Sequence, residues 1–386
     1  MNIVLYKGNF SYNVVNYFVD ELYSALGKKH NVEIIDLKKI TYVEELVYII
    51  KDKSIDMIIA FNGVGIVGDN SIYDDLGIIF CALLVDNPYY HFDRITNVKS
   101  AKTFFGIYDE GAIGMAEDFI ENNKIYTNIM HGGSFSRNLE EKKKYDISIL
   151  GSINEEYMNV DKQLKLFKND FSKRISKNLI ERIIKNKNIT VYECMHKIIE
   201  ETIPEDIRNL NEFKEECAKI FIIVDRMLRM KNRHDVISAL IEHGIEVNYF
   251  GHCKCEKFNK NGNFVNHGPI EYEKGLEVMA KSKIVINDLP LFKNGSHERI
   301  FSSMLNKALV ISNKNNYCFD IYKDKEGIVF FDNTSDLVEK VKYYLENDQE
   351  RKTIIDNAYE LTIKYNTWEN RANEILEIYN VIKNMQ

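Results

Sequence analysis

The segment Ile284–Asn313, with the sequence IVINDLPLFKNGSHERIFSSMLNKALVISN, contains a complete strand–helix–strand unit. An apolar strand is predicted to end at Asn287. A loop with Pro290 follows, and Ser296 is placed to cap the next helix. Helical spacing directs four apolar side chains toward a sheet: Ile300, Phe301, Met304 and Leu305. The run Ala308–Ile311 predicts a second strand. Two strands connected through a helix are parallel, so the segment predicts an α/β domain.

The same alternation of apolar runs and helical patterns extends over most of the chain. Continuous apolar runs indicate strands that are buried on both faces of a parallel sheet. In the first third of the chain these runs are residues 2–6, 57–61, 78–85 and 103–107. The charged stretch Asn138–Tyr145 interrupts the pattern and is interpreted as a linker. We therefore predict two Rossmann-like α/β domains, residues 1–138 and 146–365, that face a cleft, because open parallel sheets bind ligands beyond the carboxyl ends of their strands.

Two helical regions complete this organisation. Apolar residues spaced three or four apart form one stripe from Leu164 to Ile183, which predicts a helix in an insertion at about 155–215. The segment Ile220–Val224 fits either a helix or a strand. A last helix is predicted within residues 366–386, where Trp368 is expected to pack it against a domain.

Composition narrows the class of protein. The 386 residues suffice for two or three domains, and the net charge of -7 argues against extended nucleic-acid binding. The 6 cysteines are too sparse for a disulfide framework, so a cytoplasmic protein with reduced thiols is expected. No apolar run approaches the roughly 18 residues of a membrane-spanning helix, and no transmembrane segment is expected. Cys253 and Cys255 provide only two closely spaced ligands, so no metal site is predicted.

The strongest candidate for a ligand site is the predicted helix start at residues 296–299. His297, Glu298 and Arg299 are placed in its first turn, where free backbone N–H groups and the helix dipole favour a phosphate. The Arg299 guanidinium adds charge-assisted donors. A plain capped helix with exposed charges explains the pattern equally well. A second candidate is Gly151-Ser152, a glycine turn after an apolar run, where backbone N–H groups are suited to a phosphate.

The segment GSHERIF (295–301), with the following ML and KALVISN, resembles the donor-binding segment of bacterial glycosyltransferases of the GT-B fold, particularly those related to spore maturation proteins. The likeness continues in four further stretches: LLVDNPYYH (83–91), YDISILGSI (145–153), GIEVNYFG through to KIVIN (244–287) and YNTWENRANEIL (365–376). The abundance of Lys, Asn and Ile agrees with a bacterial source.

The resemblance implies transfer of a sugar, of hexosyl or N-acetylhexosaminyl type, from a nucleotide-diphosphate donor to a protein, glycan or surface polymer. The C-terminal domain would hold the donor, the N-terminal domain the acceptor, and the last helix would return to the N-terminal domain. Helix N-termini and basic side chains would neutralise the leaving diphosphate, with no metal ion or other cofactor.

The donor-binding residues implied by the resemblance lie in two groups. They are Gly151 and Ser152, and then Asn294, Gly295, Ser296, His297, Glu298, Arg299 and Ser302. Ser302 is a departure, because related enzymes commonly carry there a Glu that holds the ribose. Glu298, one helical turn earlier, is the alternative ribose ligand.

Catalytic candidates follow the apolar run at 78–85. Asp86 and His91 come after this predicted strand, where either is placed to take a proton from an acceptor hydroxyl. The alternative is that Asp86-Asn87-Pro88 forms only a turn. Two other functions remain open on the same architecture: a sugar-nucleotide epimerase, which needs no acceptor, and a non-catalytic nucleotide- or sugar-binding module.

Overall fold

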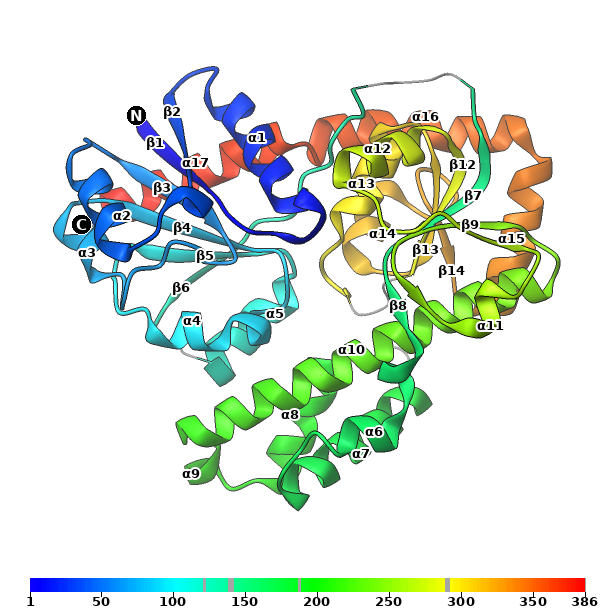
Figure 1. Ribbon diagram of the computed structural model, residues 1–386, viewed down its shortest axis with the longest axis horizontal. Coiled ribbons are helices and arrows are strands. Elements are labelled where there is room, and N and C mark those ends of the chain that lie inside the picture. The colour runs from blue at the N-terminus through cyan, green and yellow to red at the C-terminus, as the bar shows by residue number, and fades with distance from the viewer. Residues whose placement is uncertain (121–122, 138–141, 187–188, 289–291, 386) are drawn as a thin grey trace. The chain divides into compact units, whose positions relative to one another are not determined.

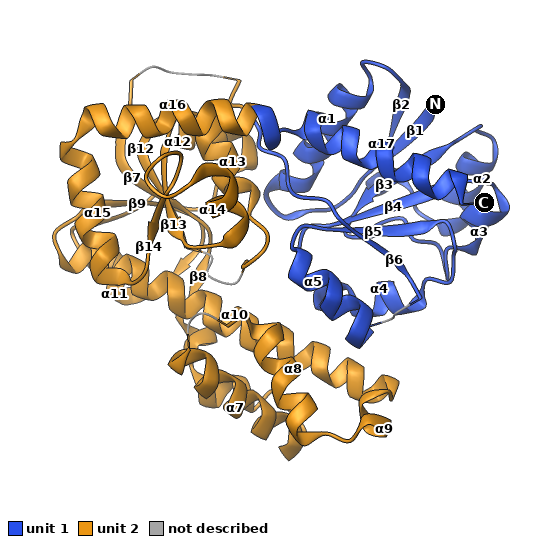
Figure 2. Cartoon of the chain, turned by 180° about the vertical axis from the view of Figure 1, so that it is seen from behind, with its two compact units in different colours: residues 1–134, 364–386 blue, residues 135–363 orange. Residues whose placement is uncertain are grey.

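A computed structural model describes residues 1–385 of the chain, with the exception of 121–122, 138–141, 187–188 and 289–291 (Figure 1). The chain divides into two compact units, each built around a parallel six-stranded sheet (Figure 2). Unit 1 comprises Met1–Ser134 and Lys364–Gln386, and unit 2 comprises Phe135–Ile363. The predicted α/β class is confirmed. The first part of the proposed linker and the loop residue Pro290 lie outside the described residues.

The sheet of unit 1 has the strand order β2-β1-β3-β4-β5-β6, so the order in which strands are added reverses between β1 and β3, while all strands stay parallel. Its strands are β1 (Asn2–Lys7), β2 (Asn31–Asp36), β3 (Met57–Phe61), β4 (Ile79–Leu84), β5 (Thr103–Ile107) and β6 (Ile125–Asn128). Every residue of β3, β4 and β5 is buried, which explains why these strands read as unbroken apolar runs.

Helices of unit 1 come from both ends of the chain. They are α1 (Val14–Leu26), α2 (Val43–Lys51), α3 (Ser71–Asp75), α4 (Phe92–Asn97), α5 (Glu110–Met115) and α17 (Trp368–Asn384), with short helical turns η1 (Ser11–Asn13), η2 (Leu37–Lys39), η3 (Pro88–His91) and η4 (Ala116–Ile120). The Trp368 ring of α17 packs against Phe18 of α1, with centroids 4.7 Å apart, and its Nε1 donates to Ser134 Oγ at 3.1 Å. The last helix is therefore an integral part of unit 1.

The sheet of unit 2 has the order β11-β9-β7-β12-β13-β14. Counted along the chain within this sheet, the order is 3-2-1-4-5-6, as in dinucleotide-binding folds, and it reverses between β7 and β12. The strands are β7 (Tyr145–Leu150), β9 (Val247–Phe250), β11 (Phe264–Asn266), β12 (Ser282–Asn287), β13 (Leu309–Asn313) and β14 (Val329–Phe331), with a separate pair, β8 (Ile153–Asn154) and β10 (Cys253–Lys254).

Helices flank this sheet on both sides (Figure 1). They are α11 (Glu256–Asn259), α12 (Tyr272–Ala280), α13 (Glu298–Leu305), α14 (Asn316–Tyr322), α15 (Thr334–Glu346) and α16 (Asp348–Tyr365). The four apolar residues predicted to face the sheet from α13 are all buried. Within the described residues, no helix of either unit is both long enough and apolar enough to cross a membrane.

The helical insertion belongs to unit 2 and differs from its prediction in two places. It contains η5 (Glu155–Met158), α6 (Val160–Leu164), α7 (Asp170–Lys185), α8 (Val191–Thr202), α9 (Glu205–Arg208) and the 32-residue α10 (Asn211–Glu242). The stripe predicted as one helix is broken between Leu164 and Asp170, because Asn169 Oδ1 accepts from Ser172 N and caps α7. The ambiguous segment Ile220–Val224 is helical, and lies inside α10.

The second half of α10 packs against the sheet of unit 2, although the helix begins in the insertion. Its apolar side chains belong to the same core as β7, β9, β12 and α15, and they are Val236, Ile237, Leu240 and Ile241. Helix α10 therefore continues without a break from the insertion into the layer of helices that covers the sheet.

Candidate functional site

The candidate site of unit 2 lies where the strand order of its sheet reverses. Residues Gly151 and Ser152 follow β7, and Asp288 follows the neighbouring strand β12. Gly151 has φ +151° and Gly251, after β9, has φ +154°. A Cβ atom on Gly251 would lie 1.9 Å from the Gly151 carbonyl oxygen, so glycine is required for the two turns to pack. Ligands of open parallel sheets bind at such a reversal point.

Arg233 of α10 is the central side chain of this edge. Its Nε lies 2.5 Å from Asp288 Oδ2, its Nη2 lies 3.1 Å from Oδ1, and its Nη1 donates to the Ser152 carbonyl oxygen at 2.5 Å. The side chains of Arg233 and Asp288 are only 7% and 0% exposed. Burial by itself acts to lower the pKa of the Arg233 guanidinium, but the Asp288 carboxylate outweighs burial and leaves that pKa raised.

Arg299, in the first turn of α13, retains an unused donor. Its Nη1 is buried and has no hydrogen-bond partner among the described residues. Burial lowers the pKa of this guanidinium, with a further contribution from the charge of Arg233, while Glu298 and Asp288 act in the opposite direction. A buried donor without an acceptor is unfavourable, so this end of Arg299 is suited to receive an anion.

The start of α13 differs from its prediction. The helix begins at Glu298, and the capping residue is His297, whose Nδ1 accepts from Arg299 N at 3.2 Å. The predicted cap, Ser296, is buried, and its Oγ accepts from the Cys318 thiol at 3.2 Å instead. His297 also contacts the Glu298 carboxylate. The backbone N–H of Arg299 is therefore already hydrogen-bonded to the His297 imidazole, which takes the place of the serine hydroxyl that was predicted as the acceptor.

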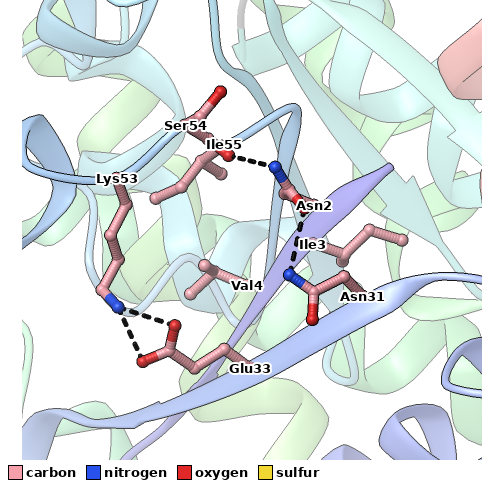
Figure 3. A pocket seen from close by; sticks show the side chains of 8 residues that line it. All are labelled: Asn2, Ile3, Val4, Asn31, Glu33, Lys53, Ser54 and Ile55. Carbon is pink, nitrogen blue, oxygen red and sulfur yellow. Dashed lines mark hydrogen bonds and ion pairs between the residues drawn. The ribbon is translucent and has the colours of Figure 1, made fainter.

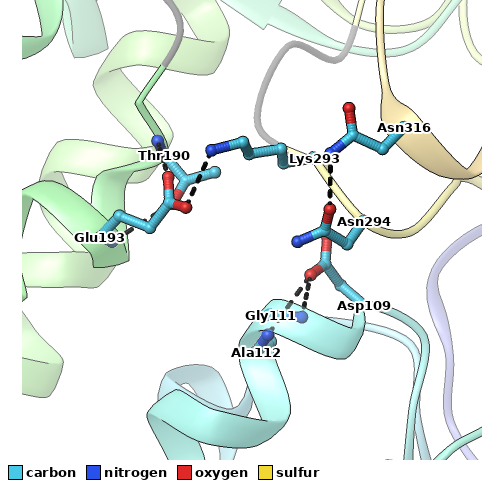
Figure 4. Close-up of polar contacts among 8 residues, drawn as sticks. All are labelled: Asp109, Gly111, Ala112, Thr190, Glu193, Lys293, Asn294 and Asn316. Atoms are coloured by element: carbon cyan, nitrogen blue, oxygen red, sulfur yellow. Dashed lines mark hydrogen bonds and ion pairs between the residues drawn. The ribbon is translucent and has the colours of Figure 1, made fainter.

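Ser302 lies at the contact between helices α13 and α12. It is fully buried, and its Oγ lies 3.1 Å from Tyr272 Oη of α12. Gly295 is also buried. Asn294 Oδ1 accepts from Asn316 Nδ2 at 2.8 Å, and the adjacent Lys293 forms an ion pair of 3.0 Å with Glu193 of the insertion (Figure 4). The segment before α13 is thus tied both to α14 and to the insertion.

The catalytic candidates lie together at the carboxyl edge of the sheet of unit 1. Asp86 is half-buried, two residues beyond β4, and His91 is the buried last residue of η3. His91 Nε2 has no hydrogen-bond partner among the described residues. Burial, with a smaller contribution from Arg94, lowers the pKa of His91 to about 4. The turn itself is capped by Asn87, whose Oδ1 accepts from Tyr89 N, and not by Asp86.

The loop at 131–134 and Asp109 both have structural roles. The loop at 131–134 holds α17, since a Cβ on Gly132 would lie 2.7 Å from the Trp368 ring and Gly133 N donates to the Asn366 carbonyl. Asp109 caps α5 by accepting from Gly111 N and Ala112 N (Figure 4). Among the residues that the structure describes, no group of three or more His, Cys, Asp and Glu side chains is arranged to hold a metal ion.

A pocket of about 230 Å³ lies at the opposite edge of the sheet of unit 1 (Figure 3). Its lining comes from the amino ends of β1 and β2 and from the segment before β3, and includes the Lys53–Glu33 ion pair of 2.7 Å. Parallel sheets bind their ligands at the carboxyl edge, so this pocket is not the candidate site.

The sequence predicted part of this site and missed its centre. Gly151, Ser152 and Arg299 were singled out, whereas Arg233 was not. A signal for Arg233 exists in the spacing of α10, because it precedes Val236 and Ile237 by three and four residues and so shares their sheet-facing side. A charged residue such as Arg233 on the apolar face of a helix departs from the usual pattern, and this departure can be seen in the sequence.

Comparison with known proteins agrees with this architecture. Residues 231–377 match the family model described as "Glycosyl transferase-like", a region that includes both Arg233 and α13. The Anabaena protein HepE, solved in complex with UDP, superposes with a TM-score of 0.59 at 10% identity, over 99% of this chain and 100% of that one. This chain has the GT-B fold.

Two further solved structures share this fold. AviGT4, a glycosyltransferase involved in avilamycin A biosynthesis, has a TM-score of 0.56 at 9% identity, over 99% of this chain and 98% of that one. A DNA-modifying β-glucosyltransferase has a TM-score of 0.54 at 14% identity, over 99% and 100%. No curated protein sequence matches significantly. The predicted GT-B fold is confirmed, and the family model supports the glycosyltransferase prediction over residues 231–377, while the narrower resemblance to spore maturation proteins stays a prediction.

Proposed function

We propose that this GT-B protein transfers a sugar from a nucleoside diphosphate donor, bound at the carboxyl edge of unit 2, to an acceptor hydroxyl. The observation that carries the proposal is the buried Nη1 of Arg299, which has no partner among the described residues. A diphosphate oxygen supplies the missing acceptor. Charge-assisted hydrogen bonds contribute about 1.5–3 kcal/mol each. Two or three of them reach the roughly 4–8 kcal/mol of a millimolar to micromolar ligand.

The donor that we propose is a UDP-sugar of hexosyl or N-acetylhexosaminyl type. The support is that HepE structures contain UDP, UDP with glucose, and UDP-glucose. Arg299, the first turn of α13 and the backbone around Ser152 would stabilise the leaving diphosphate, so that we expect no metal ion or cofactor. Glu298, which is buried beside His297, is the proposed ligand of the ribose, because Ser302 is engaged by Tyr272.

Unit 1 would provide the acceptor side. The acceptor O–H gives its proton to Asp86 or His91 as its oxygen bonds to the anomeric carbon, and the bond from that carbon to the diphosphate oxygen breaks. With a pKa of about 4, His91 is neutral at pH 7 and has a free ring nitrogen for a proton, so both His91 and Asp86 stay candidates for the base. We propose a protein, glycan or surface polymer as acceptor, and a cytoplasmic location in a bacterium.

A thermal-shift screen tests the donor site directly. UDP, GDP, ADP and CDP would be compared with their nucleosides, in EDTA, on the wild type, on Arg299→Gln and on Arg137→Gln as an exposed control in the same unit. We expect UDP to raise Tm in the wild type and the control, and to do so much less in Arg299→Gln, since ligand binding stabilises the folded state. If no nucleotide diphosphate raises Tm, the proposal is wrong.

A non-catalytic nucleotide-binding module is the second candidate, favoured by the engagement of Ser302 with Tyr272. It predicts nucleotide binding with neither transfer nor hydrolysis. Incubation of the wild type with UDP-glucose and UDP-N-acetylglucosamine, with UDP release measured over hours, separates the two, because transferases usually hydrolyse their donor slowly when no acceptor is present. UDP release that is lost in Asp86→Asn would exclude the binding module.

A further inference from the structure

We propose that the outer face of α7, together with the loop before it, docks on the surface of a bilayer that contains anionic phospholipids. This surface, called here the basic face, is defined by five exposed cations: Lys165, Lys168, Arg174, Lys177 and Lys185. The inference goes beyond the proposed function and does not depend on it, because none of these residues belongs to the donor site or to the catalytic candidates.

Charge is divided unevenly within the insertion. Residues 162–185 contain 8 basic and 2 acidic side chains, whereas residues 191–208 contain 2 basic and 5 acidic ones. The chain as a whole has a net charge of -7. The part of the insertion around α7 is therefore a strongly cationic region on an acidic protein, and this polarity would orient the insertion toward a negatively charged surface.

The cations of the basic face have no carboxylate partners. Nearby cations that do have one are Lys173, which pairs with Asp170, and Arg182, which pairs with Glu201. The five members of the basic face form no ion pair within the described residues. Glu181 is exposed among them, so the face keeps a clear positive excess that is available to an external anion.

Helix α7 turns the basic face away from the core of its own unit. Its apolar side, which includes Ile175, Leu179 and Ile183, is buried against α8 and α10. Arg174 and Lys177 are exposed on the opposite side of the helix. Figure 2 shows α7 on the side of the insertion that is remote from the sheet of unit 2. A broad surface can therefore approach these cations without meeting that sheet.

Two exposed apolar side chains lie beside these cations. Leu166 stands between Lys165 and Lys168 and is 60% exposed. Ile184 precedes Lys185 and is 49% exposed. A dissolved polyanion, such as a nucleic acid or an acidic polysaccharide, would leave both side chains in water, whereas the headgroup region of a bilayer buries them. The pattern therefore favours lipid over a dissolved polymer.

The number of cations sets the expected strength of docking. Each Lys or Arg close to an anionic bilayer raises the partition onto it by about fivefold. Five such residues favour an anionic bilayer over a neutral one by about 10³-fold. Binding of this strength is reversible, and it weakens as salt screens the charges.

Sedimentation of the full-length protein with vesicles tests the docking. Vesicles of phosphatidylglycerol mixed with phosphatidylcholine would be compared with vesicles of phosphatidylcholine alone, at low and at high salt. We expect the wild type to sediment with the anionic vesicles at low salt only. Lys165→Gln, Lys168→Gln and Lys177→Gln combined should lower the partition by about 10²-fold. Leu166→Ser should lower it by about tenfold with no change of charge.

A matched control removes the same charge elsewhere on unit 2. Lys254→Gln, Lys314→Gln and Lys342→Gln combined replace exposed lysines outside the basic face. This control should keep the partition within about twofold of the wild type, because charges that do not approach the bilayer are screened. Circular dichroism verifies that each variant is folded.

Three results would overturn the proposal. The first is a wild type that sediments no better with anionic vesicles than with neutral ones. The second is an equal loss of partition in the control and in the basic-face variant, which would make net charge the cause. The third is a Leu166→Ser variant that partitions as the wild type does, which would point to a dissolved polyanion. UDP binding tests the proposed function separately, so the failure of either one is recognised on its own.

Discussion

Unit 2 places Arg233, Arg299 and Asp288 at the carboxyl edge of its sheet, whereas unit 1 places a half-buried Asp86 and a buried His91 at the same edge of its own. Both sheets are parallel and six-stranded, so the difference lies in the side chains and not in the architecture. The cationic edge suits a leaving diphosphate, and the edge with a carboxylate and a neutral imidazole suits an acceptor hydroxyl. Under the proposed function, one fold would serve two halves of a reaction through the choice of a few residues.

The two edges also differ in what surrounds one glycine of each, Gly251 in unit 2 and Gly63 in unit 1. In unit 2, Gly251 lies directly against the carbonyl oxygen of Gly151, where backbone meets backbone. In unit 1, a Cβ on Gly63 would meet mainly the Ile66 side chain, at 2.8 Å, and that methyl group is able to move. At these two positions the glycine of unit 2 would meet backbone, and the glycine of unit 1 would meet a side chain.

The largest effect is expected from the catalytic candidates, and it tests the division between the edges. Replacing the residue that acts as base, by Asp86→Asn or His91→Gln, should slow transfer by about 10²–10⁴-fold. The UDP dissociation constant should stay at its wild-type value in both variants, because these residues belong to unit 1. Transfer and UDP calorimetry measured on each variant provide the check. Loss of UDP affinity in Asp86→Asn would contradict the proposed division of roles between the edges of unit 1 and unit 2.

The glycine contact should give the largest effect on folding. Gly251→Ala should lower the free energy of unfolding by about 4 kcal/mol, since it combines overlap with a carbonyl and an unfavourable backbone angle. Gly63→Ala, with φ +64°, should lose only about 1 kcal/mol. Urea denaturation measures both, and Gly262→Ala, where a Cβ would meet nothing within 4 Å, serves as control. Equal losses at the two edges would show that their packing does not differ.

The neutral state of His91 predicts acid sensitivity in unit 1. Its pKa falls from 6.5 in the unfolded chain to about 4 in the folded one. Between these values only the unfolded chain binds the proton, so the contribution to stability is full above pH 6.5 and is lost as the pH falls to 4. The loss amounts to about 3 kcal/mol. His91→Gln should remove it, as measured by urea denaturation at pH 7.5 and 4.5. Replacement of the exposed His243 by Gln should leave the loss in place.

The smallest effect should come from the ion pair between Lys293 and Glu193. Both side chains are partly exposed, so a double-mutant cycle with Lys293→Met and Glu193→Gln should give a coupling of at most about 1 kcal/mol. Thermal unfolding measures this coupling. A markedly larger value would show that the insertion stabilises the donor edge more than its single ion pair implies.

Local patterns predicted most of the strands, because a buried parallel strand leaves a continuous apolar run that needs no knowledge of its neighbours. The start of α13 is predicted one residue early, since His297 caps the helix where Ser296 was expected. Helix α16 was not predicted, although Ile354, Ile355 and Ala358 mark its buried side. Arg233 was missed because its role depends on Asp288, 55 residues away, and such a pairing exists only in the folded chain.

Helix α10 sets a limit on how this protein can be redesigned. At about 1.5 Å per residue, its 32 residues extend over roughly 48 Å, and the same rod carries insertion contacts at its start and sheet contacts at its end. The insertion is therefore not a detachable module. Any excision of residues 155–215 has to join the new chain end to α10 in helical register, ahead of Arg233, or the donor edge loses its support.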